Sequence, residues 1–321
     1  MSHSQDSRIL AVACLVAAMV FFGCVPVFLR FFVAGERLDP WAVNAARYAV
    51  AALFWLPVVL VLARRQKSDA GARPGRSVWR DALVPTAANL VGQVTYGLSP
   101  AYASAPTMGF LLRLSFPFAI LFGVLFIVEE RRLARTPLFL AGAGVCLAGV
   151  ATMFIEGLAA EGSVSLTGLV ILVVSAMGWG AYAVSLRKCM AGYPARLGFG
   201  VICLYTAGVL LVLAILFGRP ASLGHASGGV WAALGGSALL GIAFGHMLYY
   251  RGIHRLGPVV TSGLMLAQPL VTYAGAALVL GESLTWMQGM GGLGVVAGGA
   301  ILLAAEARIG HAARQAAPAT D

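Results

Sequence analysis

The sequence predicts an all-α integral membrane protein with ten transmembrane helices, arranged as two inverted five-helix repeats. Of its 321 residues, 60% are hydrophobic and only 11% are charged, and the mean hydropathy is +0.88. Its apolar stretches reach about 20 residues, which at 1.5 Å per residue matches the roughly 30 Å hydrocarbon core of a bilayer. Composition and stretch length therefore indicate membrane spans rather than a soluble core.

An internal repeat sets the architecture. The two halves align without a gap, 152 residues apart, through these pairs: Pro106/Pro258, Leu112/Leu264, Pro117/Pro269, Gly123/Gly275, Glu130/Glu282 and Gly142/Gly294. Each half holds five apolar stretches, an odd number, so the second half must enter the membrane from the opposite side, as in the inverted repeats of many transporters. We predict one repeat at residues 1–157 and a second at 158–321 with a short cytoplasmic C-terminal tail.

The elements follow from the apolar stretches in chain order. The expected spans are 8–32, 41–63, 82–100, 105–128, 134–155, 166–187, 197–217, 229–250, 258–280 and 285–305. Residues 1–8 and 310–321 are interpreted as tails, and 63–80 as the one sizeable loop. The third and eighth spans carry polar groups.

Positive charge alternates between loops, and cytoplasmic loops hold the excess of Lys and Arg. The basic set comprises Arg64, Arg65, Lys67, Arg73, Arg76, Arg80, Arg131, Arg132, Arg135, Arg187, Lys188, Arg196, Arg251 and Arg255. The opposite set holds Arg30, Arg37, Arg219, Glu36, Asp39, Glu156, Glu161 and Glu282. We therefore expect both termini to be cytoplasmic. Topology and anionic membrane lipid account for the net charge of +10, so no nucleic-acid partner is expected.

The sequence lacks the residues that several classes of chemistry require. The five cysteines lie within or at the ends of spans, so a disulfide framework is not indicated. The intramembrane segments hold one titratable histidine, His246, and no acid, which argues against an enzyme, a metal site or a carboxylate proton relay. We interpret His246 as a hydrogen-bonded packing residue. A phosphate-binding loop of the Gly-x-x-x-x-Gly-Lys-Ser/Thr type is absent, so we expect no cofactor and no ATP hydrolysis by this chain.

Taken together, the sequence resembles the EamA-type branch of the drug/metabolite transporter superfamily. The features that carry the resemblance are the Gly23 region, Pro40, the segment Asn44–Tyr48, Pro106, Pro258, Glu130 and Gly281–Glu282. It departs in the second half, where Leu204–Tyr205 stands at the position of Arg47–Tyr48. The resemblance implies a ten-helix carrier of the bacterial inner membrane with a central cavity shared by both halves, spans 5 and 10 toward the periphery, and export rather than uptake. It does not imply a substrate.

Arg113 is the foremost candidate for function, because charged groups inside a bilayer are costly and usually face a cavity or a partner. It lies about 10 Å inside the fourth span. It snorkels outward or bonds carbonyls at a span end, or it binds an anion, since a guanidinium holds a carboxylate or phosphate by two hydrogen bonds. Arg47 lies at a similar depth, and for it we favour a structural role. No Asp or Glu falls in the middle of any span.

Helical spacing predicts which faces point inward, because residues three, four and seven apart share one side of a helix. Three stripes result: Asn89, Gln93 and Tyr96; Ser175, Trp179 and Tyr182; and Thr261, Met265, Gln268 and Thr272. These groups either bond between helices or line a cavity. The predicted substrate-binding residues are Arg113, Gln93, Tyr96, Trp179, Tyr182, Gln268 and Met265.

Pro117 and Pro269 occupy equivalent positions in spans 4 and 9, where each removes a backbone hydrogen bond. We predict hinges there, with fixed bends as the alternative. The spacing of Gly294 and Gly298 permits close helix approach, which we assign to packing within the chain. The chain is expected to be a monomer or a weak homodimer.

These expectations combine into one functional hypothesis and one alternative. The hypothesis is a secondary transporter that moves a small amino-acid-like molecule or organic anion across the inner membrane by alternating access, with export favoured. The alternative is a flippase of the same fold for a lipid or lipid-linked phosphate. It would use Arg113 on the phosphate.

Overall fold

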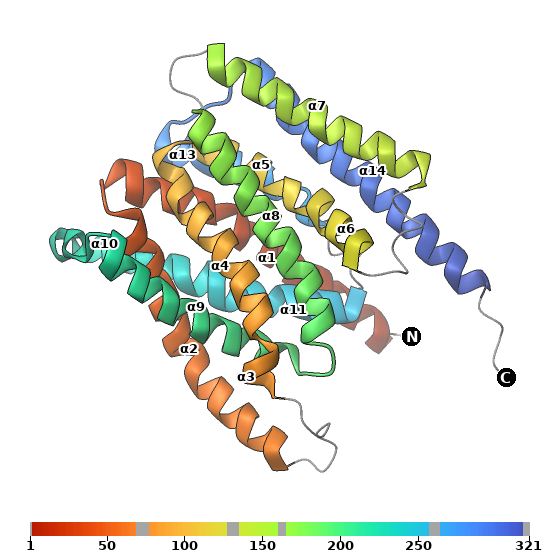
Figure 1. Ribbon diagram of the computed structural model, residues 1–321, viewed down its shortest axis with the longest axis horizontal. Helices are drawn as coiled ribbons and strands as arrows, with labels where there is room; N and C mark the ends of the chain where they lie inside the picture. Colours follow the sequence, from red (N-terminus) through yellow and green to blue (C-terminus); the bar gives the residue numbers. More distant parts are fainter. Residues whose placement is uncertain (1, 69–76, 127–134, 160–164, 257–263, 317–321) are drawn as a thin grey trace.

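A computed structural model describes residues 2–68, 77–126, 135–159, 165–256 and 264–316 (Figure 1). These residues form helices and no strands. In chain order the helices are α1 (Ser2–Arg30), η1 (Phe31–Gly35), α2 (Pro40–Ser68), α3 (Val78–Asp81), α4 (Leu83–Leu98), η2 (Ser99–Ala101), α5 (Ala105–Leu111), η3 (Leu112–Leu114), α6 (Ser115–Phe126), α7 (Pro137–Ala159), α8 (Leu166–Cys189), α9 (Ala195–Phe217), η5 (Pro220–His225), α10 (Gly228–Ala238), η6 (Leu239–Phe244), α11 (Gly245–Leu256), α13 (Gln268–Leu280) and α14 (Trp286–Ala316). Some residues named in the sequence predictions lie outside these ranges: Arg73, Arg76, Glu130, Arg131, Arg132, Glu161, Pro258 and Thr261.

Seven helices of the described chain are long and apolar enough to cross a membrane. They cover Ile9–Gly35, Pro40–Arg65, Ala105–Phe126, Leu166–Cys189, Ala195–Phe217, Gly228–Arg251 and Trp286–Ala305. The expected third, fifth and ninth spans contain α4, α7 and α13. The described apolar parts of these helices are shorter than those of the seven candidates. A multi-pass membrane protein is confirmed by these segments, while ten crossings and inverted repeats stay predictions.

Local sequence explains where several helices begin. Ser104, Ser165 and Ser227 stand directly before α5, α8 and α10, and each side chain accepts a hydrogen bond from the backbone N–H three residues later. Such caps satisfy N–H groups that a helix leaves without partners. After α13, Gly281 takes a left-handed conformation with φ of 65° and ends the helix.

Helices continue into both predicted tails, because α1 begins at Ser2 and α14 continues to Ala316. The apolar parts of these two helices are Ile9–Gly35 and Trp286–Ala305, so the described residues of both tails lie outside the candidate membrane spans. Where the apolar part of α14 ends, residues 304–308 read Ala-Ala-Glu-Ala-Arg, and these residue types rank among the strongest helix formers. The start of α1 and the end of α14 lie toward the same end of the molecule (Figure 1).

Spans 4 and 8 are interrupted rather than continuous. Span 4 consists of α5, the 3-10 turn η3 and α6, and span 8 consists of α10, the π-helical segment η6 and α11. Short non-α segments inside long helices often mark functional sites or hinges. The break at η3 contains Arg113.

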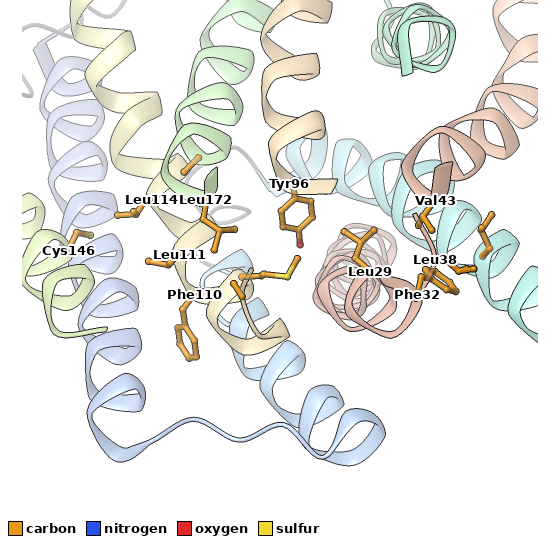
Figure 2. Close-up of a cluster of buried hydrophobic side chains, with 14 of the residues drawn as sticks. Leu29, Phe32, Leu38, Val43, Tyr96, Phe110, Leu111, Leu114, Cys146 and Leu172 are labelled. Atoms are coloured by element: carbon orange, nitrogen blue, oxygen red, sulfur yellow. The ribbon is translucent and has the colours of Figure 1, made fainter. Parts of the chain in front are cut away.

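The helices pack in recurring pairs. α1 lies against α11 and α13, α4 and α6 lie against α8, α2 lies against α9, and α5 lies against α13. The largest apolar cluster joins α1, η1, α4, α5 and α8 through Leu29, Phe32, Tyr96, Phe110 and Leu172 (Figure 2). Large apolar side chains such as Leu53, Ile215 and Leu278 are exposed on the outside, as expected where lipid replaces water.

α7 and α14 lie side by side along one edge of the molecule (Figure 1), where the family resemblance placed spans 5 and 10. Their backbones touch through glycine. A Cβ at Gly149 would lie 2.5 Å from the carbonyl oxygen of Gly291, and one at Gly298 would lie 2.6 Å from the backbone nitrogen of Cys146. The predicted small-residue seam therefore packs within the chain.

Candidate functional site

Arg113 lies at the break in the middle of span 4, and the sequence around it explains the break. Pro117 has no N–H to donate to the Arg113 carbonyl four residues earlier, so a regular α-helical bond is lost at this point. The chain tightens instead into η3, where the Ser115 N–H bonds back to Leu112 and Arg113 carbonyls. The side chain of Arg113 is partly buried.

The same break recurs at the matching position of the second half. Pro269 removes the donor for the Met265 carbonyl, and α13 begins only at Gln268. The Ala267 N–H bonds to the Leu264 carbonyl at 3.2 Å, and the Leu270 N–H bonds to the Ala267 carbonyl at 3.0 Å, which are three-residue turns. Both halves thus interrupt a helix just ahead of an equivalent proline.

Arg113 connects the two breaks directly. Its Nη1 donates to the Met265 carbonyl at 3.1 Å, and its Nη2 donates to Oε1 of Gln268 at 2.9 Å. Met265 stands 152 residues after Arg113, so the guanidinium binds the backbone of its own counterpart in the other repeat. That carbonyl is the one that Pro269 leaves without a helical donor. The Nε atom of Arg113 is buried and has no hydrogen-bond partner in the described part of the chain.

Neither intramembrane arginine has a carboxylate partner among the described residues. Arg47 is 2% exposed, and its Nε donates to the Ser237 hydroxyl at 2.9 Å. The Tyr96 hydroxyl lies within electrostatic range of the guanidinium groups of both Arg47 and Arg113. Two positive charges therefore share one region of the interior with neutral partners only, which is an expensive arrangement without an anion or water.

Three members of the predicted stripes hold helices together. The Asn89 amide donates to the Thr206 hydroxyl at 2.9 Å, the Ser175 hydroxyl donates to the Gly92 carbonyl at 2.9 Å, and the Thr272 hydroxyl donates to the Gly23 carbonyl at 2.7 Å. These three residues therefore bond between helices, which was the alternative to lining a cavity. The other stripe residues are the ones left to line a site.

The remaining predicted residues form two groups. Met265 and Gln268 surround Arg113, as described above. Trp179 and Tyr182 contact each other edge to face at 5.7 Å between ring centroids, and the Trp179 indole packs close to Gly92, one residue before Gln93. Gln93 is 7% exposed, and its carbonyl accepts a hydrogen bond from the Asn44 amide at 2.9 Å. Among the hydrogen bonds and ring contacts of the described residues, none joins Trp179 or Tyr182 to Arg113.

The two prolines lie at helix starts and not within continuous helices. Pro117 is the third residue of α6, and Pro269 is the second residue of α13. Proline is well tolerated in a first turn, because the N–H it lacks would have no partner there. The predicted kinks are therefore helix breaks, and their role as hinges stays a prediction.

The sequence analysis missed an aromatic group on α11. Tyr249 lies within electrostatic range of Arg113, and Tyr250 lies close to Tyr182. On the same helix His246 stacks on Phe199 with 4.3 Å between ring centroids, and its Nδ1 lies 3.0 Å from the Ile242 carbonyl. The spacing of residues 246, 249 and 250 places them on one helical face, and this signal was present in the sequence.

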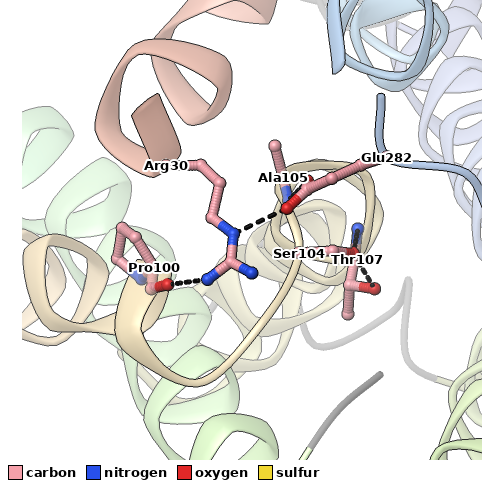
Figure 3. A network of polar contacts seen from close by, with 6 residues as sticks. All are labelled: Arg30, Pro100, Ser104, Ala105, Thr107 and Glu282. Atoms are coloured by element: carbon pink, nitrogen blue, oxygen red, sulfur yellow. Dashed lines mark hydrogen bonds and ion pairs between the residues drawn. The ribbon is translucent and has the colours of Figure 1, made fainter. Parts of the chain in front are cut away.

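An ionic network joins several helices near the turn that follows α13 (Figure 3). Nε of Arg30 lies 2.6 Å from Oε1 of Glu282, and Nη1 of Arg30 donates to the Pro100 carbonyl. The other carboxylate oxygen of Glu282 accepts the Ala105 N–H at 2.8 Å, at the start of α5. The network joins α1, η2, α5 and the turn after α13, at the end predicted to face outward.

The described residues offer no group of three or more His, Cys, Asp or Glu that could hold a metal ion. The side chains described above instead supply guanidinium groups and aromatic faces.

Residues 166–304 match the model of the EamA-like transporter family, which confirms the resemblance predicted from the sequence. A protein of Clostridium kluyveri, described as an uncharacterized transporter, is 25% identical over 255 residues, which cover 77% of this chain and 78% of that protein. A crystal structure at 18% sequence identity covers 94% of this chain and 99% of its own, with a TM-score of 0.60, and shows a shared fold.

Proposed function

We propose that this chain, a membrane transporter with an EamA-like domain in its second half, moves a small organic anion or amino-acid-like molecule by alternating access. The observation that carries the proposal is Arg113, whose guanidinium lies where the broken helices of the two repeats meet. Transporters of this kind bind substrate near the midplane, at discontinuous helices on the repeat interface. The substrate would bind at that junction.

The charge balance favours an anionic group on the substrate. Arg113 and Arg47 have only neutral partners among the described residues, and the Nε of Arg113 makes no hydrogen bond. A carboxylate would supply both the missing charge and the missing acceptor, in the planar geometry that a guanidinium matches. An amino acid carries such a carboxylate, and so does a simple organic acid.

Aromatic and amide groups would hold the rest of the substrate. Tyr96, Trp179 and Tyr182 present rings in the interior, and aromatic faces suit an apolar side chain. Gln93 would orient the polar part, and the hydroxyl of Tyr96 would approach the anion from between the two guanidinium groups. The mixture predicts a substrate with one anionic end and one apolar end.

The helix pairing supports alternating access by two related halves. A two-fold axis that exchanges spans 1–5 with spans 6–10 would turn the α4–α8 pair into the α11–α1 pair, and the α6–α8 pair into the α13–α1 pair. It would map the pairs α2–α9 and α7–α14 onto themselves. All of these pairs pack together. The Arg30–Glu282 network would then hold the outward end closed while the other end is open.

Location and direction complete the proposal. We place the protein in the bacterial inner membrane with both termini in the cytoplasm, because the basic loops lie on that side and the chain ends lie toward one end of the molecule. Transport would be driven by a gradient or by exchange. Export is favoured by the family resemblance.

The test is uptake by proteoliposomes that contain wild type or Arg113→Gln. Labelled amino-acid and carboxylate pools are offered in separate assays, and Arg219→Gln, an exposed arginine in a loop, serves as the matched control. Hydrogen bonds to a charged group contribute about 1.5–3 kcal/mol, so uptake of an anionic substrate should fall by roughly ten- to a hundredfold in Arg113→Gln alone.

Unchanged uptake by a folded Arg113→Gln protein would show that Arg113 is a structural anchor, and the proposal would be wrong. Scrambling of a phosphate-bearing lipid without uptake of any soluble carboxylate would instead favour the flippase.

A further inference from the structure

We infer that Gln268 and the Met265 carbonyl are resting ligands of Arg113 with which a substrate carboxylate competes, so that anion binding releases the start of α13. This inference rests on the proposed function. It makes Gln268, which the sequence analysis predicts to bind the substrate, a group that competes with the substrate. The two roles predict opposite effects of removing the side-chain amide.

The guanidinium would bind a carboxylate through nitrogens that its resting ligands already use. A carboxylate can bind an arginine by two hydrogen bonds either at the Nη1–Nη2 edge or at the Nε–Nη2 edge. Both edges include Nη2, which donates one of its two N–H groups to Gln268 at 2.9 Å. The Nε atom is buried and has no partner among the described residues. A carboxylate at the Nε–Nη2 edge would satisfy Nε and the second N–H of Nη2, and it would place a negative charge beside the Gln268 oxygen, which weakens the resting bond.

The backbone of the second break depends on the same guanidinium. Pro269 cannot donate to the Met265 carbonyl, and Arg113 Nη1 supplies the donor at 3.1 Å. When the guanidinium turns toward a carboxylate, this carbonyl has to find water or another donor. The turn from Leu264 to Gln268 would then rearrange at the first residue of α13.

α13 connects this junction to the ionic network. Its 13 residues span about 20 Å at 1.5 Å per residue, and the turn after its last residue carries Glu282. In its first two turns the Thr272 hydroxyl bonds to the Gly23 carbonyl of α1, and Thr272 also contacts Gly109 of α5. A short helix held at both ends is a physical connection through which occupation of Arg113 reaches the Arg30–Glu282 pair.

The experiment uses the purified full-length chain and benzoate, a carboxylate with an aromatic face. Phenylglyoxal modifies arginine side chains, and peptide mass spectrometry measures the modified fraction of Arg113 alone. The quantity compared is the benzoate concentration that halves this modification. Gln268→Leu removes the competing acceptor, and Gln268→Glu replaces it with a carboxylate. Gln288→Leu, at a buried glutamine that bonds within the start of α14, is the matched control.

If Gln268 competes with the anion, the half-protecting concentration falls roughly tenfold in Gln268→Leu and rises at least tenfold in Gln268→Glu, since a tenfold change corresponds to about 1.4 kcal/mol. The control should match wild type. Weaker protection in both variants would mean that Gln268 orients the anion, and absence of protection in every protein would mean that Arg113 takes no carboxylate. Either result overturns the inference.

The inference and the proposed function can fail separately. Loss of transport in Arg113→Gln together with weaker protection in both Gln268 variants would leave the proposed function standing and remove the competition. Thermal unfolding of each variant in detergent establishes that the compared proteins are folded.

Discussion

The α7–α14 seam and the junction between the two broken helices hold this molecule together in opposite ways. At the seam, glycines bring two backbones into contact, and Gly149 and Gly298 leave no room for a Cβ. At the junction, an arginine side chain spans the distance and bonds to a carbonyl and an amide. A backbone contact has one arrangement, whereas a side chain can exchange partners. The seam therefore has one possible packing, whereas the side chain at the junction is free to change its hydrogen-bond partners.

The largest expected effect is at the seam. Gly149→Leu should destabilise the protein by about 3 kcal/mol, because its Cβ alone would lie 2.5 Å from the Gly291 carbonyl and 2.7 Å from the Val295 nitrogen. Thermal unfolding in detergent measures the loss. Gly144→Leu is the matched control, since Gly144 lies on the same helix with nothing within 4 Å of its Cβ position. Equal melting of the two variants would show that the seam is not rigid.

This seam is also where the sequence was most informative. Glycine spacing predicted close packing within the chain, and the internal repeat predicted equivalent prolines, because both are properties of residues near one another in the sequence or at a fixed offset. The match of residues 166–304 to the EamA-like transporter family model confirms the resemblance seen in the sequence. Arg113, Met265 and Gln268 were all selected from depth and helical spacing, and they lie together in the structure.

The sequence could not predict which of these groups bond to each other. Gln268 lies 155 residues from Arg113, and only the packing of α5 against α13 brings their side chains within 2.9 Å. For the same reason Asn89, Ser175 and Thr272 could not be separated from the cavity candidates, since a helical face does not reveal its partner.

The second largest effect tests the chemistry of the junction. Arg113→Met should lower anion uptake roughly thirtyfold, equivalent to about 2 kcal/mol, because it removes the positive charge and the N–H donors that would bind the anion. The double variant Arg113→Met/Met265→Arg moves the cation to the matching break of the other half and should recover part of this loss. Proteoliposome uptake measures both. A folded double variant without recovery would show that the two breaks are not interchangeable.

A smaller effect is expected at the far end of α13. Glu282→Gln removes the charge that Arg30 contacts at 2.6 Å but keeps an acceptor for the Ala105 N–H. Both side chains are partly solvent-exposed, so the ion pair contributes about 1 kcal/mol or less. The outward end should open more often, which a cysteine placed at Pro100 would report as up to fivefold faster labelling by an impermeant thiol reagent. Asp39→Asn is the control, because Asp39 is also predicted to face outward but takes no part in this network. Equal labelling rates in the two variants would show that the network does not hold the outward end closed.

The smallest effect distinguishes the two prolines. Pro269→Ala supplies an N–H for the Met265 carbonyl, which then depends less on Arg113, so the guanidinium is freer to take a carboxylate. The half-protecting benzoate concentration should fall about two- to threefold, which corresponds to the weak end of a neutral hydrogen bond. Pro117→Ala makes the same chemical change in the first half, where the restored N–H would serve the Arg113 carbonyl and no side-chain ligand is released. It should therefore leave the benzoate concentration unchanged. Equal shifts in both variants would mean that the prolines act through general helix flexibility, and the asymmetry between the two breaks would lose its functional meaning.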